Sequence, residues 1–355
     1  MNEWLGLIIL AVVLLIVLGA AGFLAVGLFQ ARSLIRREFT AYFLSPIAYV
    51  VMFVFLLATG FLFSNTLDQL TASGPQGVEF PLRAVIGDQW IFWLVFLVIP
   101  PLLTMRLFAE ERGTGTLEML MTSPLRDWQL VLSKYVACFG FYVVMWLPTL
   151  LYVPILVDAG RPVFDFQTAW TAWSITLVVG LALLLLAVFQ TVVPGGTDVR
   201  LVGVGALVLG LIATGVGAWG HYTRDAVHIL EWPARIASGP MPVVATYLGL
   251  MLAGAMFLAL GLFISSLVRN QLVAALLSLA LSLVFIVLGF QQTDLDPTDA
   301  LDRARLYISV PLHFSRDFTR GVIDTRHIIL YLSVAVFALF LTVRTLEGRR
   351  YGAKP

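Results

Sequence analysis

The sequence predicts an all-α integral membrane protein, a polytopic helical bundle of about nine transmembrane helices. Hydrophobic residues make up 60% of the 355 residues and charged residues only 12%, whereas about 25% of a soluble domain is charged. The charges lie between apolar runs that reach the roughly 20 residues needed to cross a bilayer as a helix. Barrel strands would alternate with a period of two and would be half as long, so these runs predict helices.

The expected spans are nine apolar segments whose gaps differ in charge. If successive gaps alternate sides, one set carries an excess of Lys and Arg, and the other carries an excess of Asp and Glu. Because basic residues collect in the cytoplasm, the first set is expected there, with the N-terminus outside and the C-terminus inside. The segments are 4–29, 46–64, 89–105, 129–157, 169–193, 200–220, 242–267, 271–290 and 327–346.

Segment 4–29 has two interpretations, a retained anchor or a cleaved secretory signal. Glu3 stands where a signal would carry basic residues, the apolar run is too long, and arginines follow it. These features favour the anchor. Cys138, the only cysteine, lies inside an apolar run, so no internal disulfide is expected and the redox compartment is not indicated.

Residues 30–45 predict a helix lying in the membrane surface. Their apolar residues fall near one helical face, while Arg32, Arg36 and Arg37 fall elsewhere, toward anionic headgroups. A cytoplasmic extension of the next span is the alternative. The pairs Ser45-Pro46 and Ser123-Pro124 each predict the start of a span, with serine as N-cap and proline at the first helical position.

The gap at 291–326 is the longest external loop expected. Its apolar residues predict short amphipathic helices that fold back against the bundle. His313, Ser315 and Asp317 lie close together in the sequence, but catalytic groups act through spatial arrangement, so a solvated loop is the expectation for 313–318. Neither the four histidines nor the aspartates from 294 to 302 have metal-site spacing.

Two absences limit the function. No ionisable residue lies in the middle of an expected span, which argues against proton- and ion-coupled carriers. The two lysines, Lys134 and Lys354, lie outside any GxxxxGK[ST] motif, so the chain lacks the phosphate-binding loop of a P-loop ATPase. We therefore expect no catalytic residue, metal or cofactor in this chain, and the energy for active transport would come from another subunit.

The stretch AEERGTGTLEMLMTSPLRDW at 109–128 combines charges, threonines and glycines between two apolar runs. Gly113 and Gly115 permit a tight reversal, after which Thr114 or Thr116 could cap a short helix over 117–121. Glu118 would then lie in the first turn of that helix, where the helix dipole favours an acid. A loop that only stays hydrated would not need the apolar residues of this helix, so the stretch predicts a short helix held in the cytoplasm between two spans.

Four segments resemble the permease subunits of ABC-2 type transporters, in particular the gliding-motility-associated branch. They are RREFTAYFLSPIAYVV (36–51), TMRLFAEERGTGTLEMLMTSPLRDWQLVLSKY (104–135), YLGLMLAGAMFLALGLFISSLVRNQLVAA (247–275) and FTRGVIDTRHIILYLSVAVFALFLTVRTLEGRR (318–350). The E-R-x-x-G-T-x-E-x-L pattern is the most specific part, since it follows the second core span. The resemblance covers roughly 30–157 and 243–350, about two-thirds of the chain.

The resemblance implies a six-helix exporter core whose coupling helix, at 106–128, docks on a separate ATPase subunit that binds ATP. A second permease copy or paralogue would complete the transporter in the cell membrane, and no nucleic-acid partner is expected. The residues implied for ATPase coupling are Glu110, Glu111, Arg112, Gly115, Thr116 and Glu118. Arg36 and Arg37 would belong to the connecting helix, and the loop with Ser265, Ser266, Arg269 and Asn270 would be a second cytoplasmic contact.

The expected organisation departs from this family at two places. Segment 1–29 adds a helix before the connecting helix at 30–45, and 158–242 inserts two helices between the core halves at 46–157 and 243–355. The substrate is not indicated. A membrane-embedded enzyme acting on lipid-linked substrates through Asp294, Asp296 or His313 is one alternative, and a non-transporting motility or anchoring component is another.

Overall fold

The computed structural model describes residues 27, 31–73, 82–87, 89–117, 126–151, 241–287 and 307–352, and every regular element within them is helical. The fold class predicted from the sequence is confirmed for this part of the chain. Three of the nine expected spans, 4–29, 169–193 and 200–220, lie outside or almost wholly outside the described residues, as does nearly all of the 158–242 insertion.

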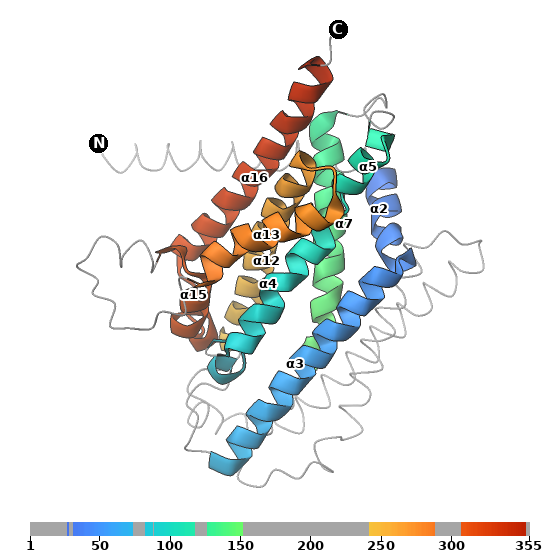
Figure 1. Ribbon diagram of the computed structural model, residues 1–355. Helices are drawn as coiled ribbons and strands as arrows, with labels where there is room; N and C mark the ends of the chain where they lie inside the picture. Colours follow the sequence, from blue (N-terminus) through green and yellow to red (C-terminus); the bar gives the residue numbers. More distant parts are fainter. Residues whose placement is uncertain are drawn as a thin grey trace, which may run out of the picture.

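The described helices follow one another through the chain with short π and 3₁₀ segments between them (Figure 1). The α-helices are α2 (Arg32–Leu44), α3 (Pro46–Ser73), α4 (Trp90–Thr104), α5 (Ala109–Gly113), α7 (Asp127–Trp146), α12 (Met241–Leu267), α13 (Gln271–Val287), α15 (Val310–Arg316) and α16 (Thr325–Gly352). The π segment is η1 (Arg83–Gly87), and the 3₁₀ segments are η2 (Leu147–Leu151) and η4 (Phe318–Arg320).

Four helices of the described part are long and apolar enough to cross a membrane, namely Ile47–Thr66, Asp127–Leu150, Pro242–Leu267 and Thr325–Arg349. Two shorter apolar helices, α4 and α13, occupy the expected spans at 89–105 and 271–290. At about 1.5 Å per residue, their 15 and 17 residues are shorter than a typical hydrocarbon core is thick. The start of α3 at Pro46, directly after Ser45, is as predicted.

Helix α12 lies at the centre of the bundle and packs against α4, α7, α13 and α16 (Figure 1). Successive long helices run in opposite directions, which gathers α5, the α12–α13 turn and the C-terminal part of α16 at one end, here called the α5 end. The opposite end carries α15, η1 and η4 and is called the α15 end. Helix α2 packs along α7 near the α5 end.

Small residues on α12 let neighbouring helices approach closely. A Cβ at Gly254 would overlap the ring of Tyr142 on α7, and one at Gly261 would overlap the side chain of Thr104 on α4. Between the two glycines, Phe257 of α12 packs edge-on against Phe96 of α4. In lipid, where apolar burial between helices gains little, close packing of this kind is a main source of association.

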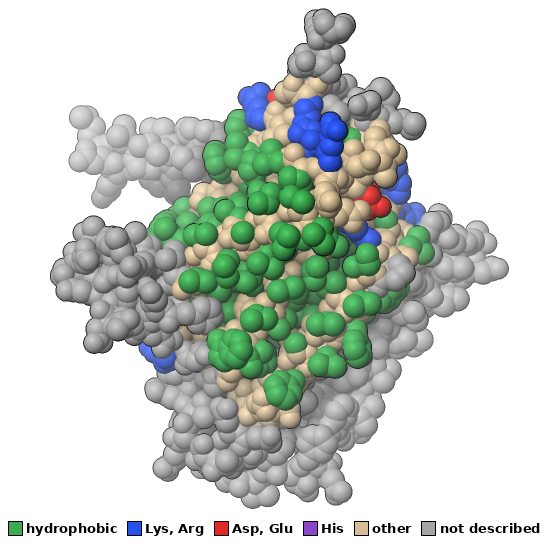
Figure 2. All heavy atoms as spheres, in the orientation of Figure 1, with side chains coloured by type: hydrophobic (Ala, Val, Ile, Leu, Met, Phe, Trp, Pro, Cys, Tyr) green, Lys and Arg blue, Asp and Glu red, His purple; other side chains and the backbone are tan. Residues whose placement is uncertain are grey.

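Large hydrophobic side chains also cover the outside of the bundle. On α3, α13 and α16 many of them are exposed, as in a helix that faces lipid (Figure 2). Phe53 on α3 and Val336 on α16 are exposed to 66% and 65%, values that would be unfavourable in water. The outer surface therefore has the character of a membrane protein, whose solvent on this side is the bilayer.

The prediction that residues 313–318 form a solvated loop is wrong. His313, Phe314 and Ser315 are buried in α15, and Phe318 of η4 is fully buried. The physical reason is that Phe314 and Phe318 pack against the open backbone of Gly249 on α12, which carries the polar residues between them inward. The prediction that part of 291–326 forms short helices folding back against the bundle is confirmed by α15 and η4, while 291–306 lies outside the described residues.

The polar groups of α15 find partners among themselves and on α16. The His313 and His327 rings stack with centroids 3.7 Å apart. His313 Nδ1 lies 2.8 Å from the Tyr331 hydroxyl, and His327 Nε2 lies 2.8 Å from a carboxylate oxygen of Asp317. In the part of the chain that the structure describes, no three histidine, cysteine or acidic side chains lie together as metal ligands would.

Replacing Gly254 by alanine is expected to lower the thermal unfolding midpoint of the protein in detergent. Tyr142 cannot move aside without losing its hydrogen bond to the Leu250 carbonyl, 3.0 Å away, so the new methyl group overpacks the core at a cost of about 1–3 kcal/mol. Gly348→Ala is the control, because a Cβ there meets open space. Equal midpoints for the two variants would contradict close packing at Gly254.

Candidate coupling site

Helix α5 is attached to the end of α12 through Ser265. The Ser265 hydroxyl accepts hydrogen bonds from the backbone N–H groups of Phe108 and Ala109, both at 3.1 Å, and donates to the Met105 carbonyl at 3.1 Å. These N–H groups open α5 and would otherwise lack partners, since the first N–H groups of a helix have none within it. A single buried hydroxyl thus fixes where α5 begins relative to α12.

Arg112 makes the second attachment between α5 and α12. Its Nη1 donates to the carbonyls of Ser266 and Val268, at 2.7 and 3.1 Å, which belong to the last turn of α12 and the residue after it. A Cβ at Gly113 would lie only 3.0 Å from the Arg269 carbonyl, so the glycine permits this approach. Helix α5 was not predicted from the sequence; it ends at Gly113, one of the two glycines that were expected to come before the helix over 117–121.

After α5 the chain turns at Gly115, one of the two glycines at which the sequence predicts a tight reversal. Gly115 has a φ of +76°, a conformation that other residues rarely adopt. Thr114 Oγ1 donates to the Glu110 carbonyl at 3.0 Å and lies 2.9 Å from Thr116 Oγ1. Residues 113–116 are exposed, and the helix expected over 117–121, with Glu118, lies outside the described residues beyond Leu117.

Lys134 joins α5, α2 and α7 through a buried ion-pair network. Its ammonium lies 2.7 Å from Glu111 Oε1 and 3.2 Å from Glu38 Oε2, and it is only 2% exposed. The second oxygen of Glu111 is buried without a hydrogen-bond partner in the described part of the chain. We call Glu38, Glu111 and Lys134 the charge triad. The spacing of the three residues in the sequence gives no local signal that they meet.

The predicted helix at 30–45 is present as α2, with the predicted faces. Leu34 and Tyr42 are buried against α7, while Arg36 and Arg37 are exposed. The Tyr42 hydroxyl donates to the Leu103 carbonyl of α4 at 2.9 Å. The extended backbone at Ser45 separates α2 from α3, so α2 is a distinct helix and not a simple extension of the next span.

A family comparison agrees with this arrangement. The model for ABC-2 family transporter proteins matches residues 34–214, just over half of the chain. The chain belongs to this family. No curated protein and no solved structure gives a significant match.

As a family member, the permease is the multi-pass membrane subunit of a transporter and is a non-catalytic transmembrane subunit. The alternative of a membrane-embedded enzyme is therefore not supported. The matched range begins inside α2 and includes all three residues of the charge triad, whereas Arg269, Asn270 and the helices from α12 onward lie beyond it.

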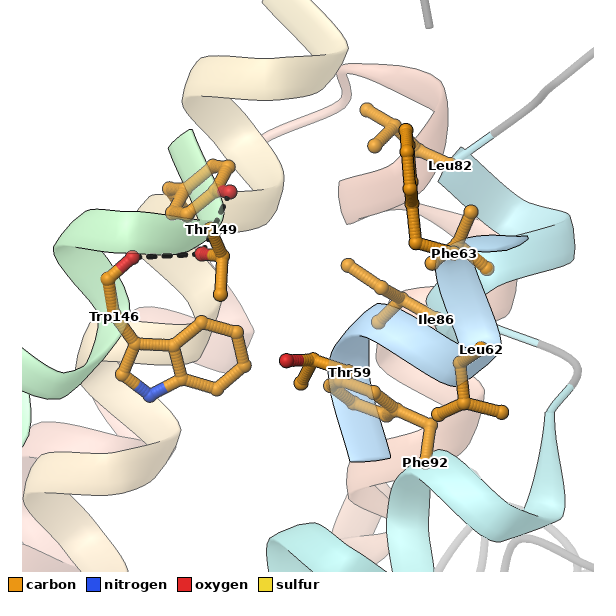
Figure 3. Close-up of a pocket in the computed structure, with 10 residues that line it drawn as sticks. Thr59, Leu62, Phe63, Leu82, Ile86, Phe92, Trp146 and Thr149 are labelled. Carbon is orange, nitrogen blue, oxygen red and sulfur yellow. Dashed lines mark hydrogen bonds between the residues drawn. The ribbon is translucent and has the colours of Figure 1, made fainter. Parts of the chain in front are cut away.

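The permease also contains a small cavity between α3, α4, α7, α12, η1 and η2 (Figure 3). Its volume is about 40 Å³, enough for a few water molecules and too small for a sugar or lipid. Thr149 Oγ1 donates to the Trp146 carbonyl at 2.7 Å and lies 2.9 Å from the Tyr247 hydroxyl, while Leu62 and Ile86 line the opposite side. The cavity therefore does not identify a substrate.

The two carboxyl groups of the triad differ in their electrostatics. Burial raises the pKa of Glu111 above its ordinary value, and Lys134 offsets this only in part. Burial acts in the same direction on Glu38, but Lys134 and Arg37 together lower the pKa of Glu38 below its ordinary value. Glu38 is therefore the carboxylate that the site stabilises in its charged form.

Removal of the ammonium is expected to destabilise the permease strongly. Lys134→Met leaves two carboxylates in a largely buried site without a cation, which costs about 3–5 kcal/mol of unfolding free energy. Arg37→Gln breaks only an exposed pair with Glu38 and should cost below about 1 kcal/mol. Unfolding in detergent measures both variants, and similar losses would refute the special role of Lys134.

The triad also predicts an opposite pH response at its two acids. In the unfolded chain Glu38 is expected to have a pKa of about 4.3, and in the folded protein its pKa is lower. The charged Glu38 therefore stabilises the fold at pH values above about 4.3, and this stabilisation is lost as the pH falls through the folded pKa. In the folded protein the pKa of Glu111 is higher than its unfolded value of about 4.3. The contribution of Glu111 to the stability of the fold therefore declines as the pH rises from about 4.3 through the folded pKa. At pH 8, Glu38→Gln should therefore lower the unfolding midpoint more than Glu111→Gln does. Equal losses in both variants at pH 8 would contradict the assignment.

Proposed function

We propose that this permease is the membrane-spanning subunit of an ATP-driven exporter, and that a separate ATPase subunit binds the exposed side of α5. The observation that carries the proposal is that one side of the α5 segment is exposed while the other is attached to the helix bundle. Its tip, Glu110 with 113–116, is exposed, while its base is fastened to α2, α7 and α12. A surface segment held this firmly is suited to receive force from a partner.

A movement of α5 would be transmitted to the helix bundle through two sets of contacts. The charge triad connects α5 to α2 and α7, and Ser265 with Arg112 connects it to α12. Because α12 packs against four other helices, a displacement at α5 would shift the bundle as a packed unit. ATP hydrolysis in the partner would thereby change the access of the bundle to the two sides of the membrane.

The expected coupling residues have two roles in this proposal. Glu110, Gly115 and Thr116 would meet the ATPase, and Glu118 would continue that surface. Glu111 and Arg112 would position α5, since their side chains are engaged with Lys134 and with the end of α12. Asn270 lies in the turn beside Gly113, and Arg36 and Arg37 lie on the exposed side of α2.

The remaining organisation rests on the sequence resemblance. We propose a six-helix core formed by 46–157 and 243–355, an added helix at 1–29, an insertion at 158–242 and the α5 end in the cytoplasm. A second permease would complete the transporter. Kinship with gliding-motility-associated permeases is proposed from the E-R-x-x-G-T-x-E-x-L pattern, and the genes next to this one would test it.

Charge reversal at the tip of α5 is expected to release the ATPase subunit without unfolding the permease. Glu110→Arg changes an exposed side chain, so the unfolding midpoint should stay the same while the ATPase recovered on affinity purification in mild detergent falls at least about tenfold. Glu347→Arg, on α16 at the same end, is the control and should retain the ATPase. Loss in both variants, or in neither, would refute α5 as the docking site. The purified permease alone should show no ATP hydrolysis.

A further inference from the structure

Three arginines from separate elements lie at the α5 end, where their charges act on one another. They are Arg112 on α5, Arg269 in the α12–α13 turn and Arg349 in the last turns of α16, and we call them the arginine cluster. The bonds of Arg112 to the Ser266 and Val268 carbonyls hold its guanidinium beside the turn that carries Arg269. Burial, and then the charges of Arg349 and Arg269, lower the pKa of Arg112, which agrees with this proximity.

The cluster has no internal counterion in the described part of the permease. None of its three arginines forms an ion pair with a described carboxylate. Glu347, the acid nearest in sequence to Arg349, accepts a hydrogen bond from Arg344 at 2.9 Å. Since like charges held close together repel, an anion from outside would stabilise this arrangement.

The depth of the cluster favours a lipid headgroup over a soluble partner. One candidate span ends at Leu267, two residues before Arg269, and another ends at Arg349 itself. In a bilayer, the ends of apolar spans lie at the level of the phosphate groups, where basic residues meet anionic lipids. Basic side chains gather above the hydrophobic surface toward the α5 end in Figure 2.

A hollow and an apolar track continue from Arg269 toward the membrane interior. The hollow, of about 480 Å³, is lined by Met105, Arg269, Asn270, Gln271 and Leu272. Leu272 and Leu276, one helical turn apart on α13, are exposed to 68% and 58%. The surface is thus basic at Arg269, hollow beside it and apolar along α13. A phospholipid, in which a phosphate group is followed by hydrocarbon chains, matches this order.

We propose that the arginine cluster binds the phosphate group of an anionic phospholipid, whose acyl chain lies along Leu272 and Leu276. A guanidinium presents paired N–H donors that match phosphate oxygens, and arginine is more weakly hydrated than lysine. Arg112 holds the end of α12, so Arg269 and Arg349 carry most of the binding. This site does not depend on the proposed ATPase contact, although Arg112 and Arg269 were first expected to serve that contact.

The test compares lipids on the purified, delipidated permease by native mass spectrometry. Phosphatidylglycerol should bind in preference to phosphatidylcholine with the same acyl chains, and Arg269→Gln with Arg349→Gln should weaken phosphatidylglycerol binding by about 30-fold, as expected for two basic residues near an anionic surface. Arg344→Gln is the matched control, an exposed arginine of α16 paired with Glu347, and should retain binding. Leu272→Gln should weaken the binding of phosphatidylglycerol but should not change any stabilisation by inorganic phosphate.

Three results would overturn the proposal. Equal binding of the two lipids by the wild-type permease would show that the cluster does not recognise the anionic headgroup. Stabilisation by inorganic phosphate alone that equals the effect of phosphatidylglycerol would indicate a free anion and not a lipid. Unchanged lipid binding in the double variant, together with loss of the ATPase subunit on purification, would assign the cluster to the protein partner.

Discussion

The burial of Lys134 between two carboxylates is the constraint on which the α5 end of this permease depends. Transfer of an ammonium out of water costs several kcal/mol, and only closely placed acids offset that cost. Glu38 and Glu111 come from different helices, so α2, α5 and α7 must stay together for the lysine to be tolerated. The triad therefore fixes geometry more than it adds net stability.

The rest of the bundle extends this fixed geometry by close packing. Ser265 and Arg112 relate α5 to the end of α12, and the glycines of α12 bring α4 and α7 into direct contact with it. Since the surrounding lipid is as apolar as the helix surfaces, such contacts and buried hydrogen bonds determine which helices associate. The α15 end uses the same means, because Phe314 and Phe318 pack on Gly249.

The two ends of the bundle thus carry different chemistry. At the α5 end, arginines and the charge triad surround an exposed tip, which suits contact with a protein and with lipid headgroups. At the α15 end, His313 and His327 are buried and stack on each other, while Arg316 and Arg320 are exposed. The proposed partner is placed at the α5 end because an exposed segment there is fastened to three helices of the bundle.

The sequence by itself determined the helical membrane class, the positions of the described long helices and the turn at Gly115. These properties follow from local patterns, namely apolar length, proline after serine, and a glycine where φ must be positive. The family resemblance supplied the transporter assignment. Even the two faces of α2 could be predicted, because helical periodicity sorts Leu34 and Tyr42 from Arg36 and Arg37.

Only the tertiary structure decided that Lys134 meets Glu38 and Glu111, that a helix, α5, forms before the turn at Gly115, and that His313 is buried. Each of these depends on residues that are distant in sequence and brought together by helix packing, for which a single sequence carries no local signal. Glu111 shows the difference clearly. Its position in a charged stretch suggested a surface contact, but a buried cation on another helix gives it the role of holding that stretch in place.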